Sequence, residues 1–186
     1  LWYSATDNTV RSFNVNNLVA GPMIPASALP GGAIGAGRHL YIDYVGRRLL
    51  VTSINGDIPM YNLSDQSRAG TILNAAFNNG VIGARHLAAD PRTGTLWFAH
   101  TNGSFRELNL TSMLLTGRII PFGNGQVGGN PGAFRHMVVD AGRNLLLYSV
   151  TNGSVASIDL TTLRAGTHTI RSTAFAGAIV GAGRII

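Results

Sequence analysis

The chain of 186 residues is 45% hydrophobic and only 12% charged, with 14 basic and 8 acidic side chains that give a net charge of +6. It contains no cysteine, which excludes disulfides, thiolate metal sites and a cysteine nucleophile. No apolar run approaches the roughly 18 residues needed to cross a membrane, so we expect a soluble chain without a membrane span or a retained signal.

The first predicted elements are short strands. Leu1 to Thr6 has the pattern of a strand, Asp7-Asn8 follows as a turn, and Phe13-Asn14-Val15 belongs to a second strand. The same order returns later at Leu96 to Thr101 and Leu108-Asn109-Leu110. The chain therefore enters a repeating unit at its second strand. In each unit we expect the aromatic residues of this strand to pack in the core, and these residues are Trp2, Tyr3, Trp97, Phe98 and Tyr148.

Residues 36 to 77 contain a unit with all of its strands. Arg38 to Asp43 begins it, and two further strands, Leu49 to Ile54 and Asp57 to Leu63, flank Asn55-Gly56. Asn-Gly between alternating strands is a strong signal of a β-hairpin, because its type I′ turn needs positive φ at both positions. Ala69 to Leu73 then forms the outer strand.

The same unit returns twice more. Its first two residues, Arg38-His39, recur as Arg85-His86 after 47 residues and as Arg135-His136 after another 50. A broken copy follows at Gly183-Arg184-Ile185-Ile186. Asn102-Gly103 and Asn152-Gly153 again lie between the second and third strands. Repeats of this length, built from short strands, are typical of β-propeller blades.

We predict an all-β fold with one domain, residues 1–186. The fold is a β-propeller of four four-stranded blades, in which the N- and C-terminal strands share one blade. The blades comprise residues 183–186 with 1–30, 36–77, 83–122 and 133–175. Eight repeat positions are absent where the ends meet, because Ile186 matches Leu40 and Leu1 matches Leu49. A trimmed chain or a segment of a larger propeller therefore stays the alternative.

One motif resembles known propeller repeats. Asp90-Pro91-Arg92-Thr93-Gly94-Thr95-Leu96-Trp97 resembles the Asp-Pro-x-x-Gly-x-Leu-Trp stretch of NHL-, YWTD- and YVTN-type repeats, and Val139 to Tyr148 is a looser copy. The resemblance implies the fold and no single function, because such propellers bind proteins, glycans or nucleic acid, or act as lactonases and lyases. The blade length is also similar to that of tachylectin-like sugar-binding propellers, although their Trp-x-x-Phe element is absent.

The candidate site is a ring of arginines. Arg38, Arg85, Arg135 and Arg184 each follow a Gly/Ala-rich connection, which places four guanidinium groups around one mouth of the central channel. Such a funnel suits a carboxylate, phosphate or sulfate ligand. The alternative is a structural brace, in which each arginine pairs with a carboxylate or carbonyl of a neighbouring blade.

The other recurring polar residues predict structure rather than chemistry. His39, His86 and His136 repeat, but the fourth copy carries Ile185, so we expect packing between blades and no metal site. Asp43, Asp90 and Asp140 precede turns, where we expect them to accept backbone N–H bonds.

Catalytic signals are weak. Glu107 is the only glutamate, no carboxylate pair recurs outside the turns, and no nucleophile motif is present, so we predict no catalytic residue and no cofactor. Glycosylation stays open at the four sequons, Asn62, Asn102, Asn109 and Asn152, two of which coincide with Asn-Gly turns.

The function that fits these features is a non-enzymatic binding or assembly module. We expect a lectin-like, extracellular or secreted protein that binds glycan or protein through its propeller face, with an anionic ligand and a homo-oligomer as further possibilities. Nucleic acid is not expected as a partner. The alternatives are a structural subunit of a larger particle or filament, and a lactonase- or lyase-type enzyme.

Overall fold

The computed structural model describes residues 1–29, 40–53, 56–77, 87–100, 102–121, 136–150 and 154–171. Its strands form four antiparallel sheets, which we call blades 1 to 4. Blade 1 contains β1 (Trp2–Ser4), β2 (Val10–Asn14) and β3 (Val19–Ile24). Blade 2 contains β4 (Leu40–Asp43), β5 (Arg48–Val51), β6 (Ile58–Asn62) and β7 (Arg68–Ile72).

The other two blades have the same order. Blade 3 contains β8 (Leu87–Asp90), β9 (Thr95–Ala99), β10 (Phe105–Asn109) and β11 (Leu114–Ile120). Blade 4 contains β12 (Met137–Asp140), β13 (Leu145–Ser149), β14 (Val155–Asp159) and β15 (Arg164–Ile170). Two short 3-10 helices, Ala26–Ala28 and Asn74–Phe77, follow β3 and β7.

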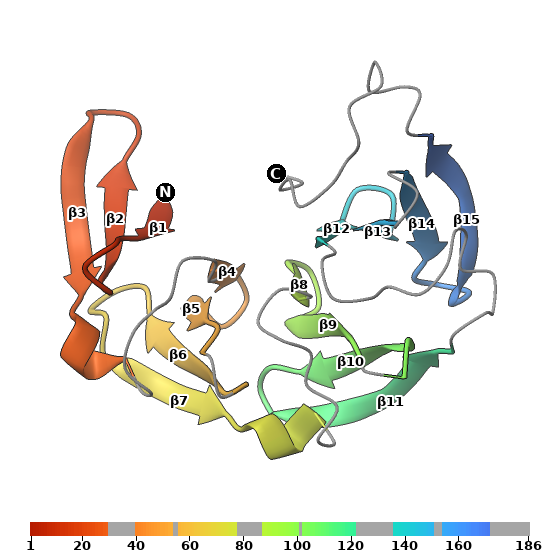
Figure 1. Ribbon diagram of the computed structural model, residues 1–186, viewed down its shortest axis with the longest axis horizontal. Helices are drawn as coiled ribbons and strands as arrows, with labels where there is room; N and C mark the ends of the chain where they lie inside the picture. Colours follow the sequence, from red (N-terminus) through yellow and green to blue (C-terminus); the bar gives the residue numbers. More distant parts are fainter. Residues whose placement is uncertain are drawn as a thin grey trace.

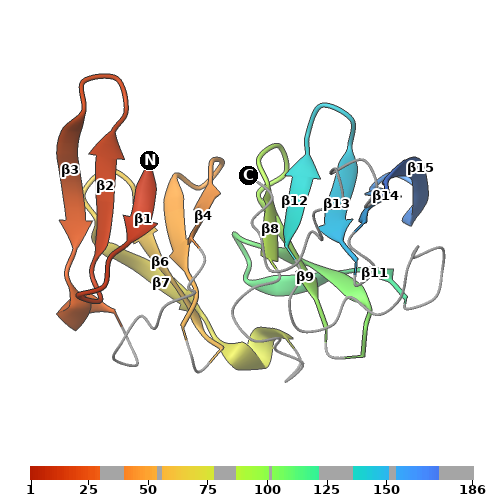
Figure 2. The ribbon, with the colours of Figure 1, turned by 45° about the horizontal axis from the view of Figure 1, so that its top comes forward.

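The four blades are arranged around a common centre, with β4, β8 and β12 innermost and β3, β7, β11 and β15 at the rim (Figure 1). The turns that join β4 to β5, β8 to β9 and β12 to β13 lie on one face of the molecule (Figure 2). The chain is therefore an all-β, four-bladed β-propeller, as the repeats predict. No helix in the described ranges is long and apolar enough to cross a membrane.

Two parts of the prediction lie outside the described residues. Blade 1 has three described strands, and its expected inner strand, residues 183–186, is not among them. The sharing of this blade by the two chain ends, and the blade boundaries, therefore stay predictions.

The hairpin turns follow from their glycines. Gly56 and Gly103 have φ of 87° and 84°, the left-handed region that glycine adopts at low cost. At the second turn the backbone N–H of Gly103 donates to the carbonyl of His100 at 2.8 Å. Two of the three predicted Asn-Gly turns thus have the expected positive φ at glycine, whereas Asn152-Gly153 lies outside the described residues. The predicted type I′ geometry is wrong at the second turn, because Asn102 is not among the residues with positive φ and Gly103, which donates to His100, is the fourth residue of the turn rather than a central one.

The repeat also extends to a position that no sequence motif marks. The turn between the last two strands of each blade contains one left-handed residue that is not glycine, and these are Leu18, Gln66, Met113 and Leu163 at φ of 57–61°. A side-chain oxygen stabilises three of these turns by accepting the backbone N–H of the residue two positions later, at 2.7–2.9 Å. The accepting oxygens belong to Asn14, Asn109 and Asp159.

Three hydrophobic clusters form the core, and each one fills the seam between two neighbouring blades. Leu49, Val51 and Tyr61 of blade 2 pack against Val10 and Ile24 of blade 1. The next seam contains Leu50, Ile58, Met60 and Ile72 of blade 2 with Leu96, Phe98 and Leu108 of blade 3. The last contains Trp97, Phe105 and Ile120 of blade 3 with Leu146, Tyr148 and Ile158 of blade 4.

The second-strand aromatics pack as predicted, with one exception. Trp97, Phe98 and Tyr148 are at most 1% exposed in the seams, and Trp2 packs against the first seam while half-buried. Tyr3 is instead 42% exposed. The expectation of core packing is wrong for Tyr3, because it lies on the side of blade 1 that faces away from blade 2.

We predict that Gly103→Ala destabilises the fold by about 1–3 kcal/mol, because a side chain is strained at its positive φ. Gly142→Ala is the matched control: this glycine is exposed in another turn, without positive φ, and its new Cβ would meet only Asp140 Oδ1 at 3.4 Å. Urea unfolding of both variants measures the difference. Equal midpoints would contradict the hairpin geometry.

Candidate functional site

The predicted arginine ring lies outside the described residues. This holds for all four members, Arg38, Arg85, Arg135 and Arg184, and for His39 and His86. The anion funnel and the brace alternative therefore both stay predictions for these residues. His136 is described, half-buried immediately before β12.

The recurring aspartates cap turns as expected. Asp43 Oδ1 accepts the backbone N–H of Gly46 at 2.9 Å, and Asp90 Oδ1 accepts that of Arg92 at 2.9 Å. Asp140 Oδ1 accepts the N–H of Arg143 at 3.1 Å. Each carboxylate also forms an ion pair with an arginine of its own turn or of the strand that follows, at 2.6–2.9 Å, and these arginines are Arg48, Arg92 and Arg143.

Two of these arginines brace neighbouring blades. Arg48 Nη2 of blade 2 also donates to the carbonyl of Leu110 in blade 3 at 2.9 Å. Arg92 of blade 3 reaches blade 4, donating from Nη1 to the carbonyl of Ala141 at 2.9 Å and from Nη2 to Asn144 Oδ1 at 2.6 Å. Arginine braces between blades thus exist in the structure, but other arginines than those of the predicted ring form them. An Arg within five residues after each recurring Asp is the sequence signal that could have identified them.

The brace affects the ionisation of Asp90. Burial alone would raise the pKa of this carboxyl, but the hydrogen bonds and the charge of Arg92 outweigh burial and lower the pKa below its ordinary value. The carboxylate therefore stabilises the fold above the ordinary pKa of about 4, and this contribution is lost as the pH falls through the lowered pKa.

Glu107 lies at a third brace. Its side chain is 4% exposed and accepts hydrogen bonds from Thr95 Oγ1 at 3.0 Å and Thr116 Oγ1 at 2.8 Å. Arg118 Nη1 donates to it at 2.8 Å, while Nη2 donates to the carbonyl of Leu160 in blade 4. The guanidinium carbon lies 5.2 Å from the centroid of the Trp97 ring. Both carboxylate oxygens are thus bonded within blade 3, and Arg118 makes the link to blade 4.

A lateral surface of blade 1 is the clearest exposed feature. We call the side of a blade that faces the preceding blade its front face. In blade 3 the front-face residues Leu96, Phe98, Leu108 and Leu110 are at most 1% exposed. By strand register their counterparts in blade 1 are Leu1, Tyr3, Phe13 and Val15. Leu1, Tyr3 and Val15 are 42–73% exposed, and Phe13 is half-buried.

Leu18 extends this surface. Its counterparts Met113 and Leu163 pack partly buried against the preceding blade's seam, whereas Leu18 is 73% exposed. We call Leu1, Tyr3, Phe13, Val15 and Leu18 the open front face.

Blade 4 carries one exposed apolar residue on its opposite side, its rear face. Ile24, Ile72 and Ile120 each end an outer strand and are at most 1% exposed in a seam. Their counterpart Ile170 pairs with Val155 in the same register but is 48% exposed. Among the described residues, contacts join β1 to β4, β4 to β8 and β8 to β12, and no comparable contact joins blade 1 to blade 4.

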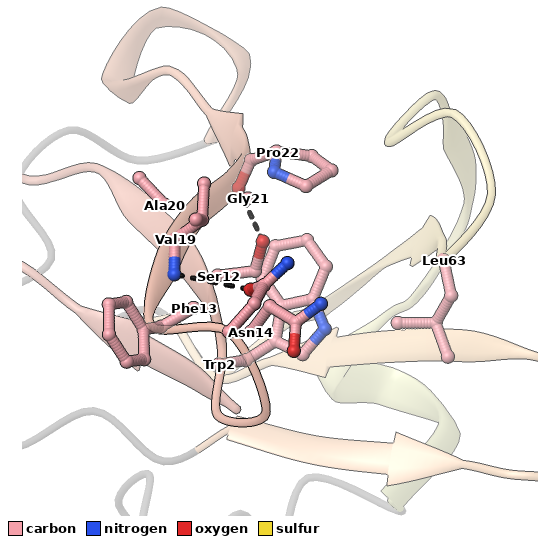
Figure 3. Close-up of a pocket in the computed structure, with 10 residues that line it drawn as sticks. Trp2, Ser12, Phe13, Asn14, Val19, Ala20, Gly21, Pro22 and Leu63 are labelled. Atoms are coloured by element: carbon pink, nitrogen blue, oxygen red, sulfur yellow. Dashed lines mark hydrogen bonds between the residues drawn. The ribbon is translucent and has the colours of Figure 1, made fainter.

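A pocket of about 360 Å³ lies elsewhere, where blade 1 meets blade 2 (Figure 3). Strands β1, β2 and β3 line most of it, and Leu63 contributes from blade 2. Its polar groups come from Ser12, Asn14 and Asn17. In the described part of the chain, no group of three or more His, Asp or Glu side chains could hold a metal ion.

The comparisons with known proteins support the fold. No family model matches the sequence, and no curated protein matches it. A solved structure titled "Structure of U3-55K" matches with a TM-score of 0.64 and 15% identity, over 91% of this chain and 47% of that chain. The chain thus spans slightly less than half of the length of that chain. In all, 745 chains of known structure match, so the likeness by itself selects no function.

We predict that Arg118→Gln lowers the free energy of unfolding by about 1–3 kcal/mol, because it leaves the buried Glu107 without its cation and removes a bond to blade 4. The partial exposure of Arg118 keeps the loss below that of a fully buried pair. Arg143→Gln is the control, since Arg143 forms an exposed ion pair and should cost little. Similar thermal midpoints for both variants would contradict a structural role for Arg118.

Proposed function

We propose that this chain is a non-enzymatic assembly module that binds protein through the open front face of blade 1. One observation carries the proposal: five apolar side chains are exposed or half-buried there, although their counterparts in blade 3 are buried or partly buried against a neighbouring blade. A contiguous apolar surface on a soluble protein commonly marks an interaction site.

The repeat indicates what kind of surface fits there. In blades 2, 3 and 4, each front face packs against the rear face of the preceding blade. The partner surface should therefore resemble a rear face, with an isoleucine at the end of its outer strand. Blade 4 carries such a face, with Ile170 exposed.

Blade 1 thus exposes a front face and blade 4 exposes one apolar residue of a rear face, so a second copy is the partner that this geometry favours. The contact would be head-to-tail, from blade 4 of one copy to blade 1 of the next. Such heterologous contacts close into a ring or extend into a filament, depending on the rotation between copies.

The remaining expectations have less support. A glycan partner through the propeller face, an anionic ligand at the arginine ring and an extracellular location are proposals from the sequence. A lactonase or lyase activity gains no support from the described residues, in which the only glutamate is bonded to Thr95, Thr116 and Arg118 of its own blade.

Two charge variants test the head-to-tail contact. Leu18→Arg blocks the front face and Ile170→Arg blocks the rear face, so each variant alone should sediment as a monomer at concentrations where the unmodified chain associates. An equimolar mixture should form a dimer with one copy of each, because one intact front face and one intact rear face remain. Leu114→Arg is the control, since Leu114 is 66% exposed at the start of the outermost strand of blade 3.

Analytical ultracentrifugation distinguishes these outcomes. An unmodified chain that stays monomeric at all concentrations would overturn the self-assembly. Two single variants that associate as the unmodified chain does would overturn the choice of surfaces.

A further inference from the structure

The pocket between blades 1 and 2 has a counterpart that is filled in another seam. The strand register makes Trp2 the counterpart of Trp97 and Ser12 the counterpart of Glu107. Trp2 pairs with Ser12 in blade 1, and Trp97 pairs with Glu107 across the corresponding two strands of blade 3. The same register makes Pro22 the counterpart of Arg118. Pro22 directly precedes Met23, which pairs with Arg11, and Arg118 directly precedes Ile119, which pairs with Arg106. Between blades 3 and 4, the Arg118 side chain occupies this place beside Trp97 and bonds to the carbonyl of Leu160.

Blade 1 has the same platform without the side chains that cover it. Ser12 and Pro22 are too short to reach the place that the Glu107–Arg118 pair takes in blade 3, and a pocket of about 360 Å³ remains beside the half-buried Trp2. Leu63 of blade 2, the counterpart of Leu160, lines it from the other side (Figure 3). A volume in this range is typical of small-molecule sites. The space is therefore an open pocket at the surface with an aromatic wall.

The polar lining selects a neutral ligand that accepts hydrogen bonds. Asn14 Oδ1 accepts the backbone N–H of Asn16 at 2.9 Å, and Asn17 Oδ1 accepts that of Val19 at 3.3 Å. These bonds fix both amides so that their NH₂ groups are the ends left to donate. Ser12 Oγ already donates to the carbonyl of Pro22 at 2.9 Å. None of the residues that line this pocket is charged.

We propose that this pocket binds a neutral carbohydrate. A pyranose ring has an apolar C–H face that can pack on the indole of Trp2, and its hydroxyl oxygens can accept from the Asn14 and Asn17 amides. A guanidinium, the group that fills the corresponding space in blade 3, carries only donors, and here Ser12 stands where Glu107 supplies its carboxylate. The site lies at the seam with blade 2, and Phe13 belongs both to its lining and to the open front face.

Tryptophan fluorescence reads out this site selectively. The chain has two tryptophans, and Trp97 is 0% exposed, so a ligand-induced change reports on Trp2. The probes are glucose, galactose, mannose and N-acetylglucosamine, with arginine methyl ester as the cationic comparison. We expect a saturable change with at least one sugar and none with arginine methyl ester.

Conservative variants locate the binding. Asn14→Asp and Asn17→Asp each keep the oxygen that caps the turn but lose the donor, so each should weaken sugar binding by about 2–10-fold. Blade 4 carries Asp159 at the position of Asn14, so the fold accepts this change. Asn16→Asp adds the same charge outside the pocket lining and should leave binding unchanged.

Three results would overturn the proposal. They are saturation by arginine methyl ester alone, saturation by none of the probes, and sugar binding that Asn14→Asp and Asn17→Asp leave unchanged.

Discussion

The seam between neighbouring blades is the interaction on which this fold depends. A sheet of four short strands cannot bury both of its faces by itself, so each blade relies on the blades at its sides. In β9 all five residues are buried, because Leu96 and Phe98 pack toward blade 2 while Trp97 and Ala99 pack toward blade 4. Blades 1 and 4 have one such seam each among the described residues. The apolar side chains of the open front face on blade 1, and Ile170 on blade 4, are exposed or half-buried for this reason.

Polar braces accompany this packing. Arg48 and Arg118 each pair with a carboxylate of their own blade and donate to a carbonyl of the next, at Leu110 and Leu160. Leu63 holds the corresponding position at the seam of blades 1 and 2, and its carbonyl accepts only the amide of Gln66 of its own turn among the described hydrogen bonds. The same seam contains the pocket beside Trp2. Two differences in the repeat, Ser12 and Pro22 in place of Glu107 and Arg118, thus separate the open seam of blades 1 and 2 from the braced seam of blades 3 and 4.

The sequence predicts those features that one or two residue types determine. The glycine of Asn-Gly marks the hairpins because it adopts positive φ at low cost, and the recurring Asp marks turns because its side chain can accept backbone N–H groups. The left-handed Leu18 and Met113 have no such signature, since context rather than residue type imposes their φ. Arg48, Arg92 and Arg143 follow their aspartates by five, two and three residues, so aligning the repeats does not bring them together. The open front face could not be predicted either, because Tyr3 has the same sequence pattern as the buried Phe98.

Amide hydrogen exchange measured over a range of protein concentrations tests the dependence on seams most directly. If neighbouring blades supply the stability, the amides of β10, which lie between two seams, should be protected at every concentration. Those of β2 should exchange faster in dilute solution and become protected as the concentration rises and a second copy covers the open front face. Equal protection of β2 and β10 in the most dilute sample, with no change on concentration, would contradict this dependence.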